Sequence, residues 1–479
     1  MNIVGEYMKK TKIIATIGPN SCSKEVLREF ILNGLDVVRI NLSHATYDFC
    51  IKVFKTIDEL NNELNTNIAT LLDTKGPDIR THKFIGGHAF LAKSSKIRIY
   101  MDEIMGDSTK FSINYPNLID DVLIGNELKV NDGLLTLKIL NKGSNYLLCE
   151  VIEEGIISDY KSVNAPGTSF HRPFLSDKDK EDILFATQHH VDFLALSFAS
   201  TREDILEVND LLINSGNDHT KLIAKIESET GVEDIEEIIK VSDGIMIARG
   251  DLGVELPMEQ VPSIQKKIVN LCHKEGKISI VATEMLSSME NFSRPTRAEV
   301  SDVANAVLES VDAVMLSGET TVGKYPLESL IMMRKIIEET EKNIDYSALL
   351  KSISNDKEDI TSIIAYNVAE SANKLSCEAI IAPTITGYTA KCVSQFRPIC
   401  PIVAVSPNKN TVKSLMLCYG VIPILTKELN SLDRIMEDSI NVSKKVLPLK
   451  EKDKVIITGG YPFKNTKHTN FLKIEEIKE

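Results

Sequence analysis

Polar side chains that could do chemistry stand at the ends of several short apolar runs in this sequence. Lys225 and Glu227 close one run, Asp251 follows the next, and Thr283 closes the one after that. Lys225 and Glu227 are two residues apart, so they share a face of an extended strand. A single polar residue at a strand end is usually a structural hydrogen-bonding group. Its recurrence at six strand ends favours a common active site.

Glu227 and Asp251 are oxygen ligands of the kind that Mg²⁺ prefers. Mg²⁺ usually takes one or two protein carboxylates together with substrate oxygens and water, and Mn²⁺ accepts similar ligands. The alternative is structural, with the two carboxylates paired to Lys225 and Arg249. The sequence predicts a divalent metal site and leaves ion pairing open.

Lys225 admits two kinds of chemistry, as a Schiff-base nucleophile or as a fixed cation that stabilises transferring charge. A Schiff-base lysine needs a lowered pKa, whereas Glu227 on the same face would keep Lys225 protonated. We therefore expect a fixed cation, which suits phosphoryl transfer.

A second group of oxygens follows two neighbouring strands. Alternation places Arg39, Asn41 and Ser43 on one face of the second strand, and Asp73 and Thr74 end the third. With one formal negative charge, the oxygens of Asn41, Ser43, Asp73 and Thr74 suit a monovalent cation. A hydrogen-bonded network between the strands fits them equally well.

These residues require an alternation of strands and helices to bring them together. We predict eight strands: 12–17, 37–42, 68–73, 192–198, 222–227, 244–249, 278–283 and 313–317. Helix signals lie between them, such as Ser23 as an N-cap and Gly34 after the helix end. The pattern predicts an α/β fold, a (β/α)8 TIM barrel whose active site lies at the carboxyl ends of the strands.

Two further regions interrupt or follow the barrel. Short apolar runs with turn signals over 77–171 predict an inserted, β-barrel-like domain on the third βα loop, since so long a loop is not expected in a compact domain. Residues 346–479 predict a separate α/β domain with a mostly parallel sheet. The barrel then comprises residues 1–76 and 172–345.

Composition limits the class of protein. With 479 residues, the chain exceeds the size of one hydrophobic core, so two or three domains are expected. A net charge of −13 argues against general affinity for nucleic acid or anionic membrane. The eight cysteines lack CxxC spacing, and no signal peptide or membrane-spanning run is evident, so we expect a cytoplasmic protein.

Seven segments of the sequence resemble the pyruvate kinase family: TKIIATIGPNS, DVVRINLSHA, LLDTKGPDIR, KIESETGVEDI, DGIMIARGDLGVELP, VATEML and SRPTRAEVSDVANAVLESVDAVMLSGETTVGKYP. The resemblance implies transfer of the phosphoryl group of phosphoenolpyruvate to ADP, giving pyruvate and ATP, the final step of glycolysis. It also implies a catalytic barrel, an inserted domain acting as a lid, a C-terminal domain that binds a phosphorylated effector, and a homotetramer.

The resemblance also implies residue roles. Lys225 would stabilise the transferring phosphoryl group, and the substrate site would comprise Arg39, Lys225, Gly250, Asp251 and Thr283. Glu227 and Asp251 would bind Mg²⁺. The K⁺ ligands would be Asn41, Ser43, Asp73 and Thr74, which resolves the earlier alternative in favour of the ion. The nucleotide would contact Asn41, His44, Arg80 and Lys161.

Three positions depart from the family pattern. Asp78 stands where K⁺-dependent members usually have Glu and K⁺-independent members have Lys. Glu284 replaces a usual Gln beside Thr283, and Ser200 stands where Arg is common.

The C-terminal domain carries a candidate effector site. The segment containing Thr384, Thr386, Gly387 and Thr389 leads into a helix N-terminus and resembles the phosphate loop of the family. The partner loop has Lys464, Lys467 and His468 in place of the usual glycine and threonines. These basic residues would bind phosphate differently, or the loop is a solvated basic segment.

Two other functions are considered. A barrel lyase or aldolase acting on an oxoacid would use the same carboxylates but leaves the inserted domain unexplained. A catalytically inactive regulatory copy would not require Lys225, Glu227, Asp251 and Thr283 together.

Overall fold

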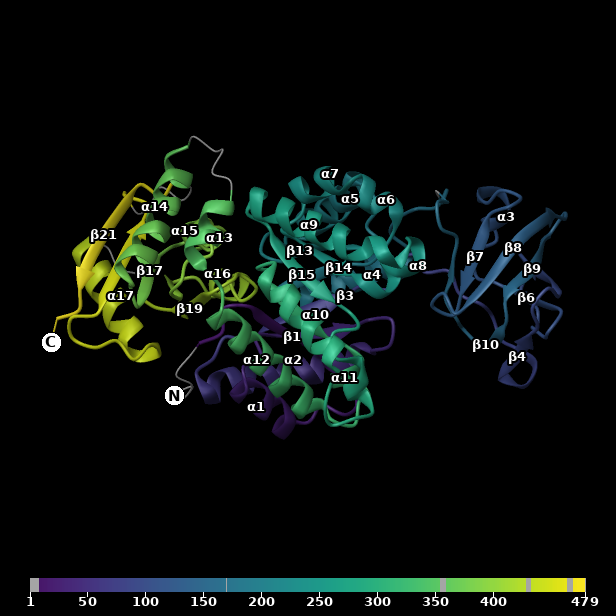
Figure 1. Ribbon diagram of the computed structural model, residues 1–479, viewed down its shortest axis with the longest axis horizontal. Helices are drawn as coiled ribbons and strands as arrows, with labels where there is room; N and C mark the ends of the chain where they lie inside the picture. Colours follow the sequence, from purple (N-terminus) through teal and green to yellow (C-terminus); the bar gives the residue numbers. More distant parts are fainter. Residues whose placement is uncertain (1–7, 169, 354–358, 428–431, 463–467, 479) are drawn as a thin grey trace.

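The computed structural model describes residues 8–168, 170–353, 359–427, 432–462 and 468–478. A central barrel lies between the C-terminal domain on one side and the inserted sheet domain on the other (Figure 1). In the described part of the chain, no helix is long and apolar enough to cross a membrane.

Eight parallel strands close into a barrel in the order β1-β16-β15-β14-β13-β12-β3-β2, which confirms the predicted fold. Each strand lies within two residues of the predicted range at either end. Their bounds are β1 (Lys12–Thr16), β2 (Val37–Asn41), β3 (Ala69–Asp73), β12 (Phe193–Leu196), β13 (Lys221–Ile226), β14 (Gly244–Ala248), β15 (Ile278–Ala282) and β16 (Ala313–Leu316). Strands of this kind are buried on both faces and therefore read as continuous apolar runs.

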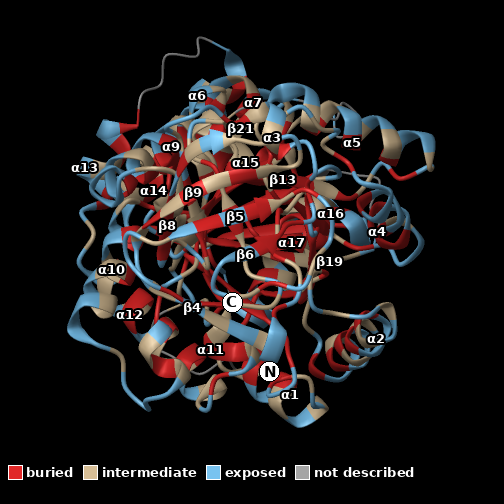
Figure 2. Cartoon of the chain, turned by 90° about the vertical axis from the view of Figure 1, so that its right-hand side faces the viewer, coloured by how far each residue is buried: buried red, intermediate tan, exposed pale blue. Residues whose placement is uncertain are grey.

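Helices surround the barrel and bury one face each. On α2, the buried residues recur every three or four positions, and Figure 2 shows exposed residues on the outer side. The helices are α1 (Lys24–Leu32), α2 (Tyr47–Leu64), α4 (Asp177–Gln188), α5 (Arg202–Asn214), α6 (Glu229–Glu233), α7 (Ile235–Val241), α8 (Arg249–Glu255), α9 (Val261–Glu275), α10 (Arg297–Leu308), α11 (Gly318–Thr321) and α12 (Pro326–Lys342).

The predicted cap of the first helix is confirmed. Ser23 accepts a hydrogen bond from Val26 N at 3.2 Å, which satisfies one of the free N–H groups of the first turn. The helix ends at Leu32, and Gly34 follows with φ +99°, a conformation that favours glycine.

The inserted domain has its own apolar core and consists of two sheets. A six-stranded sheet has the order β11-β7-β8-β9-β5-β6, and β10 pairs with β4. The elements are β4 (His88–Leu91), β5 (Lys96–Tyr100), β6 (Lys110–Ser112), α3 (Leu118–Asp121), β7 (Glu127–Val130), β8 (Leu135–Lys142), β9 (Tyr146–Glu153), β10 (Gly155–Ser158) and β11 (Val163–Asn164).

The C-terminal domain is the predicted α/β unit with a mostly parallel sheet. Its sheet has the order β19-β18-β17-β20-β21, in which only the β20–β21 pairing is antiparallel. The elements are α13 (Tyr346–Ser352), α14 (Ile360–Leu375), β17 (Ala379–Pro383), α15 (Tyr388–Gln395), β18 (Ile402–Ser406), α16 (Lys409–Ser414), β19 (Val421–Leu425), α17 (Leu432–Val446), β20 (Lys454–Gly459) and β21 (Phe471–Glu476).

The C-terminal domain closes the bottom of the barrel. Met416 and Leu417 join the apolar cluster formed by the side chains inside the barrel. In the same interface between the C-terminal domain and the barrel, Arg397 donates to Asp312 Oδ2 at 2.9 Å, and both side chains are buried. The amino ends of the strands are therefore covered by packing that stabilises the fold, and the carboxyl ends are the expected location of the active site.

His273 lies in this domain interface and should make stability depend on pH. Its Nε2 is 2.9 Å from Ser310 O, and burial together with the charge of Arg397 lowers the pKa of His273 from 6.5 to about 4. Between these two values the unfolded chain binds a proton that the folded chain does not. The free energy of unfolding should therefore lose roughly 3 kcal/mol as the pH falls from 7 to 4.

His273→Gln keeps a hydrogen-bond donor at this position without the titration. Chemical denaturation of wild type and variant at pH 7 and pH 4.5 should show a smaller loss of stability in the variant. His88→Gln, at an exposed position of β4, is the matched control. Equal pH dependence in wild type and His273→Gln would contradict this assignment.

Candidate active site

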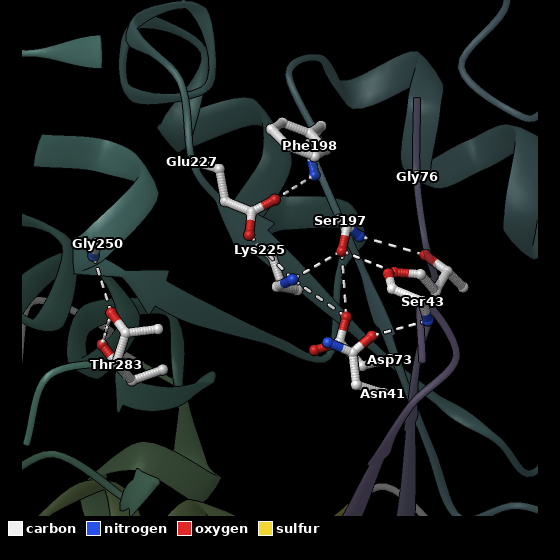
Figure 3. Close-up of polar contacts among 12 residues, drawn as sticks. Asn41, Ser43, Asp73, Gly76, Ser197, Phe198, Lys225, Glu227, Gly250 and Thr283 are labelled. Atoms are coloured by element: carbon white, nitrogen blue, oxygen red, sulfur yellow. Dashed lines mark hydrogen bonds and ion pairs between the residues drawn. The ribbon is translucent and has the colours of Figure 1, made fainter. Parts of the chain in front are cut away.

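Lys225 occupies the centre of a buried polar cluster at the carboxyl end of β13. Its ammonium lies 2.9 Å from Glu227 Oε1 and 3.1 Å from Asp73 Oδ1, and donates to Ser197 Oγ at 2.7 Å (Figure 3). Burial alone would lower the pKa of Lys225, but the charges of Asp73 and Glu227 outweigh burial and raise it. Lys225 is therefore a fixed cation, not a neutral nucleophile.

Arg39 supplies a second buried cation beside the first. Its Nε and a terminal nitrogen donate to Asp73 Oδ2 at 2.8 and 2.5 Å, and the other terminal nitrogen donates to Thr16 Oγ1 at 2.8 Å. Burial alone would raise the pKa of Asp73, but the charges of Lys225 and Arg39 outweigh it and lower this pKa. Asp73 thus fixes two cations side by side as a carboxylate.

The carboxylates of Glu227 and Asp251 face different partners. Glu227 Oε2 accepts from Phe198 N at 2.6 Å while Oε1 pairs with Lys225. The alternative in which Asp251 pairs with Arg249 is not found, because Arg249 pairs instead with Asp302 at 2.7 Å. The ion-pairing alternative therefore holds for Glu227 only.

Asp251 has the chemistry of a cation ligand. Its carboxylate has no hydrogen-bond or ion-pair partner among the described residues. Burial and the neighbouring charge of Glu227 raise the pKa of Asp251 to about 7. A buried carboxylate next to another one is destabilised unless a cation joins them, so the two fit a divalent metal. Within the described ranges, no group of three or more His, Cys, Asp or Glu side chains is placed to hold a metal ion.

Thr283 and Gly250 form a small polar pair, which lies on the other side of Lys225 from Asp73 (Figure 3). Thr283 Oγ1 accepts from Gly250 N at 2.8 Å and donates to Ala282 O at 2.7 Å. Thr283 and Glu284 have φ of +65° and +53°, a left-handed conformation that costs energy for residues other than glycine. Arg249 donates to Thr283 O at 2.9 Å and so holds this turn.

The oxygen cluster predicted from the second and third strands is assembled at one place. Asn41 Oδ1 accepts from Ser43 N at 2.9 Å, and Asp73 Oδ1 accepts from Ser197 Oγ at 3.1 Å (Figure 3). Thr74 O accepts from the same serine at 2.8 Å. Oxygens of this kind with a single formal charge fit a monovalent cation. The hydrogen bonds of Ser197 connect the end of the third strand to that of the fourth, and the bond between Ser43 and Asn41 stays within one strand end.

The predicted nucleotide residues meet where the inserted domain joins the barrel. Burial first, and then the charges of Arg80 and Arg39, lower the pKa of His44, so the imidazole lies near both arginines. Residues 80 and 162 form an antiparallel bridge, which places Lys161 beside Arg80. Asp78 pairs with Arg80 Nε, so the position that departs from the family pattern faces a cation of the chain itself.

The candidate effector loop forms a helix N-terminus. Gly387, with φ +82°, precedes α15, and its N–H donates to Thr384 Oγ1 at 2.9 Å. Thr389 Oγ1 is 2.9 Å from Thr469 Oγ1, so the loop lies against the segment after residue 467. Lys464 and Lys467 lie outside the described residues, and His468 is exposed.

Sequence reasoning missed Ser197 and Thr16. Ser197 connects Lys225, Asp73 and Thr74. It stands at the end of the fourth predicted strand, so the strand-end rule applied to that strand would have found it. Thr16 ends the first strand and holds Arg39.

Comparison with known proteins assigns the family. The model of the pyruvate kinase barrel domain matches residues 8–330, and the model of the pyruvate kinase alpha/beta domain matches residues 362–475. The chain belongs to the pyruvate kinase family. It is a phosphotransferase, and the resemblance noted in the sequence motifs is confirmed.

Full-length relatives agree with this assignment. Pyruvate kinase of Clostridium perfringens is 43% identical over 474 residues, which span 98% of this chain and 100% of that protein. Pyruvate kinase of Geobacillus stearothermophilus is 40% identical and aligns with 98% of this chain and 81% of its own length. A crystal structure of a pyruvate kinase from Cryptosporidium parvum has a TM-score of 0.92 at 33% identity, covering 98% of this chain and 96% of that one.

Proposed function

We propose that this member of the pyruvate kinase family uses Lys225 and Arg39 to hold the phosphoryl group that passes from phosphoenolpyruvate to ADP. The observation that supports these roles is the pair of buried cations that Asp73 holds at the carboxyl end of the barrel strands. Two fixed positive charges stabilise the charge that develops on the transferring group without reorganising during the step.

Glu227 and Asp251 are the proposed ligands of Mg²⁺, which would supply further positive charge to the phosphoryl oxygens. Gly250 and Thr283 would position the substrate carboxylate, together with Asp251. Because the Thr283 hydroxyl already donates to Ala282 O, the proton that the enolate carbon receives would reach it through water.

An aldolase mechanism through Lys225 is the competing chemistry for this cluster. The raised pKa of Lys225 disfavours attack of its side chain on a carbonyl, since only the neutral amine is a nucleophile. Borohydride treatment in the presence of pyruvate should leave the mass of the protein unchanged. An adduct on Lys225 would overturn the role proposed for it.

Asn41, Ser43, Asp73 and Thr74 are the proposed K⁺ ligands, and this site gives a testable dependence. With Mg²⁺ fixed, replacing K⁺ by tetramethylammonium should lower the rate of pyruvate formation at least about tenfold, equivalent to ~1.4 kcal/mol of transition-state stabilisation. The larger ion cannot enter a cluster of short oxygen contacts. An equal rate in both salts would contradict the K⁺ assignment and direct attention to Asp78, where K⁺-independent relatives carry lysine.

The inserted domain is the proposed lid over the nucleotide. Asn41, His44, Arg80 and Lys161 would contact ADP, and Lys161 would arrive from the lid. Closure would exclude water, which competes with ADP for the phosphoryl group. We further propose a homotetramer in the cytoplasm, with a phosphorylated effector at Thr384, Thr386, Gly387 and Thr389.

A further inference from the structure

A cavity of about 210 Å³ lies where the barrel meets the two connections to the inserted domain. Its walls come from the connection at 77–79, from eight described residues of the returning connection, and from the ends of the fourth to sixth barrel strands with the helices that follow. The eight residues are Val163, Asn164, Gly167, Thr168, Phe170, Arg172, Pro173 and Phe174. Lys225, Arg39 and Thr283 do not line it, whereas Asp78 does, so the cavity adjoins the active site described above without including its catalytic cations. A cavity of about 150 Å³ already accommodates benzene, so this one has room for a small aromatic molecule.

Aromatic rings form the apolar part of the cavity. Phe170 and Phe174 belong to the returning connection, and Phe198 to the end of the fourth strand. Arg172, also in the wall, has its guanidinium 4.9 Å from the ring centre of Phe170 and 5.2 Å from that of Tyr115. The one arginine in the wall is therefore already placed against rings of the inserted domain.

The polar part of the wall includes two partly buried carboxylates, of Glu229 and Glu255, that are not held in an ion pair with any described residue. Glu255 accepts one hydrogen bond, from Asn164 Nδ2 at 3.1 Å. The Glu229 carboxylate lies against Gly167, and within the described segments it has no hydrogen-bond or ion-pair partner. Both carboxylates line the same cavity, one against Asn164 and the other against Gly167, three residues further along the returning connection. Burial raises the pKa of Glu255.

Apolar walls with a small number of convergent polar groups are typical of a ligand site at a domain junction. Here the charged groups of the wall are four carboxylates, of Asp78, Asp204, Glu229 and Glu255, and the Arg172 guanidinium, which lies against Phe170 and Tyr115; aromatic faces also attract cations. We propose that this junction cavity, bounded by Phe170, Phe174, Phe198, Glu229 and Glu255, binds a small organic amine, with its ammonium between the carboxylates and its apolar body against the rings.

A ligand in this cavity would contact elements that also carry active-site residues. Glu229 follows Glu227 by two residues, and Glu255 lies on α8, the helix that carries Asp251. Phe198 donates its N–H to Glu227. A bound amine would also connect the barrel to both connections of the inserted domain.

Calorimetric titration with benzylamine, and with benzyl alcohol and benzoate as uncharged and anionic analogues, tests the proposal on the unmodified protein. Benzylamine should bind with one-to-one stoichiometry and at least about tenfold more tightly than either analogue. No binding of benzylamine at 10 mM (about the weakest affinity of interest), or equal binding of all three compounds, would overturn the proposal.

Variants locate the site. Glu229→Gln and Glu255→Gln should each weaken benzylamine binding about tenfold or more and leave benzyl alcohol unaffected. Glu233→Gln, at the exposed end of the same short helix as Glu229, is the matched control and should bind as wild type does. Unchanged affinity in both cavity variants would place the amine elsewhere and overturn the assignment.

Discussion

Replacing Lys225 by methionine is expected to lower kcat for pyruvate formation by about 10³-fold or more. Removing a single electrostatic group from a water-excluded site typically lowers kcat by about 10²- to 10³-fold. Methionine has a similar length and no charge. The ammonium is held within 3.1 Å of Asp73, Glu227 and Ser197, so the variant removes the positive charge from the centre of this cluster. Steady-state kinetics at saturating phosphoenolpyruvate and ADP measure the effect.

The variant also leaves two buried carboxylates without their shared cation. Breaking such a pair costs about 3–5 kcal/mol, so the assay belongs well below the unfolding temperature, with circular dichroism to show that the fold is kept. Lys221→Met is the matched control, because Lys221 begins the same strand, at the far end from the site. A folded Lys225→Met enzyme with turnover within tenfold of wild type would contradict the proposed role.

Asp251→Asn is expected to separate activity from stability. The Mg²⁺ concentration for half-maximal activity should rise at least about tenfold and kcat should fall about 10²-fold, since one of two metal carboxylates is lost. Stability without metal should be unchanged or higher, because the change removes a partly buried charge beside Glu227 that makes no ion pair with a described residue.

Glu227→Gln provides the contrast for this prediction. Glu227 pairs with Lys225, so its loss should impair both Mg²⁺ use and stability. Glu259→Gln, at an exposed position beyond α8, should change neither. If thermal melts without metal showed Asp251→Asn to be strongly destabilised, the carboxylate would have a structural role in place of a metal-binding one.

The sequence predicted the barrel well because its strands are buried on both faces and appear as uninterrupted apolar runs. The rule that chemistry lies at strand ends then placed Lys225 and Glu227 correctly on one face. The same rule is ambiguous about pairing between neighbours in the chain. Arg249 and Asp251 are only two residues apart in the sequence, yet Arg249 pairs with Asp302, 53 residues away.

Strand-end residues also have structural roles that periodicity does not reveal. Glu319, at the end of the eighth strand, accepts hydrogen bonds from Leu286 N and Ser317 N and is buried. Ser197 could be found from its strand, but its contact with Lys225 depends on the barrel register. The junction cavity depends on where the two connections of the inserted domain meet the barrel, which no local pattern specifies.

The most direct test of the central claim is product formation by purified protein from phosphoenolpyruvate and ADP with Mg²⁺ and K⁺. We expect pyruvate and ATP in equal amounts, because one phosphoryl group moves for each pyruvate released. Absence of both products, even with sugar phosphates and AMP added as effectors, would contradict it and favour a non-catalytic member of the family.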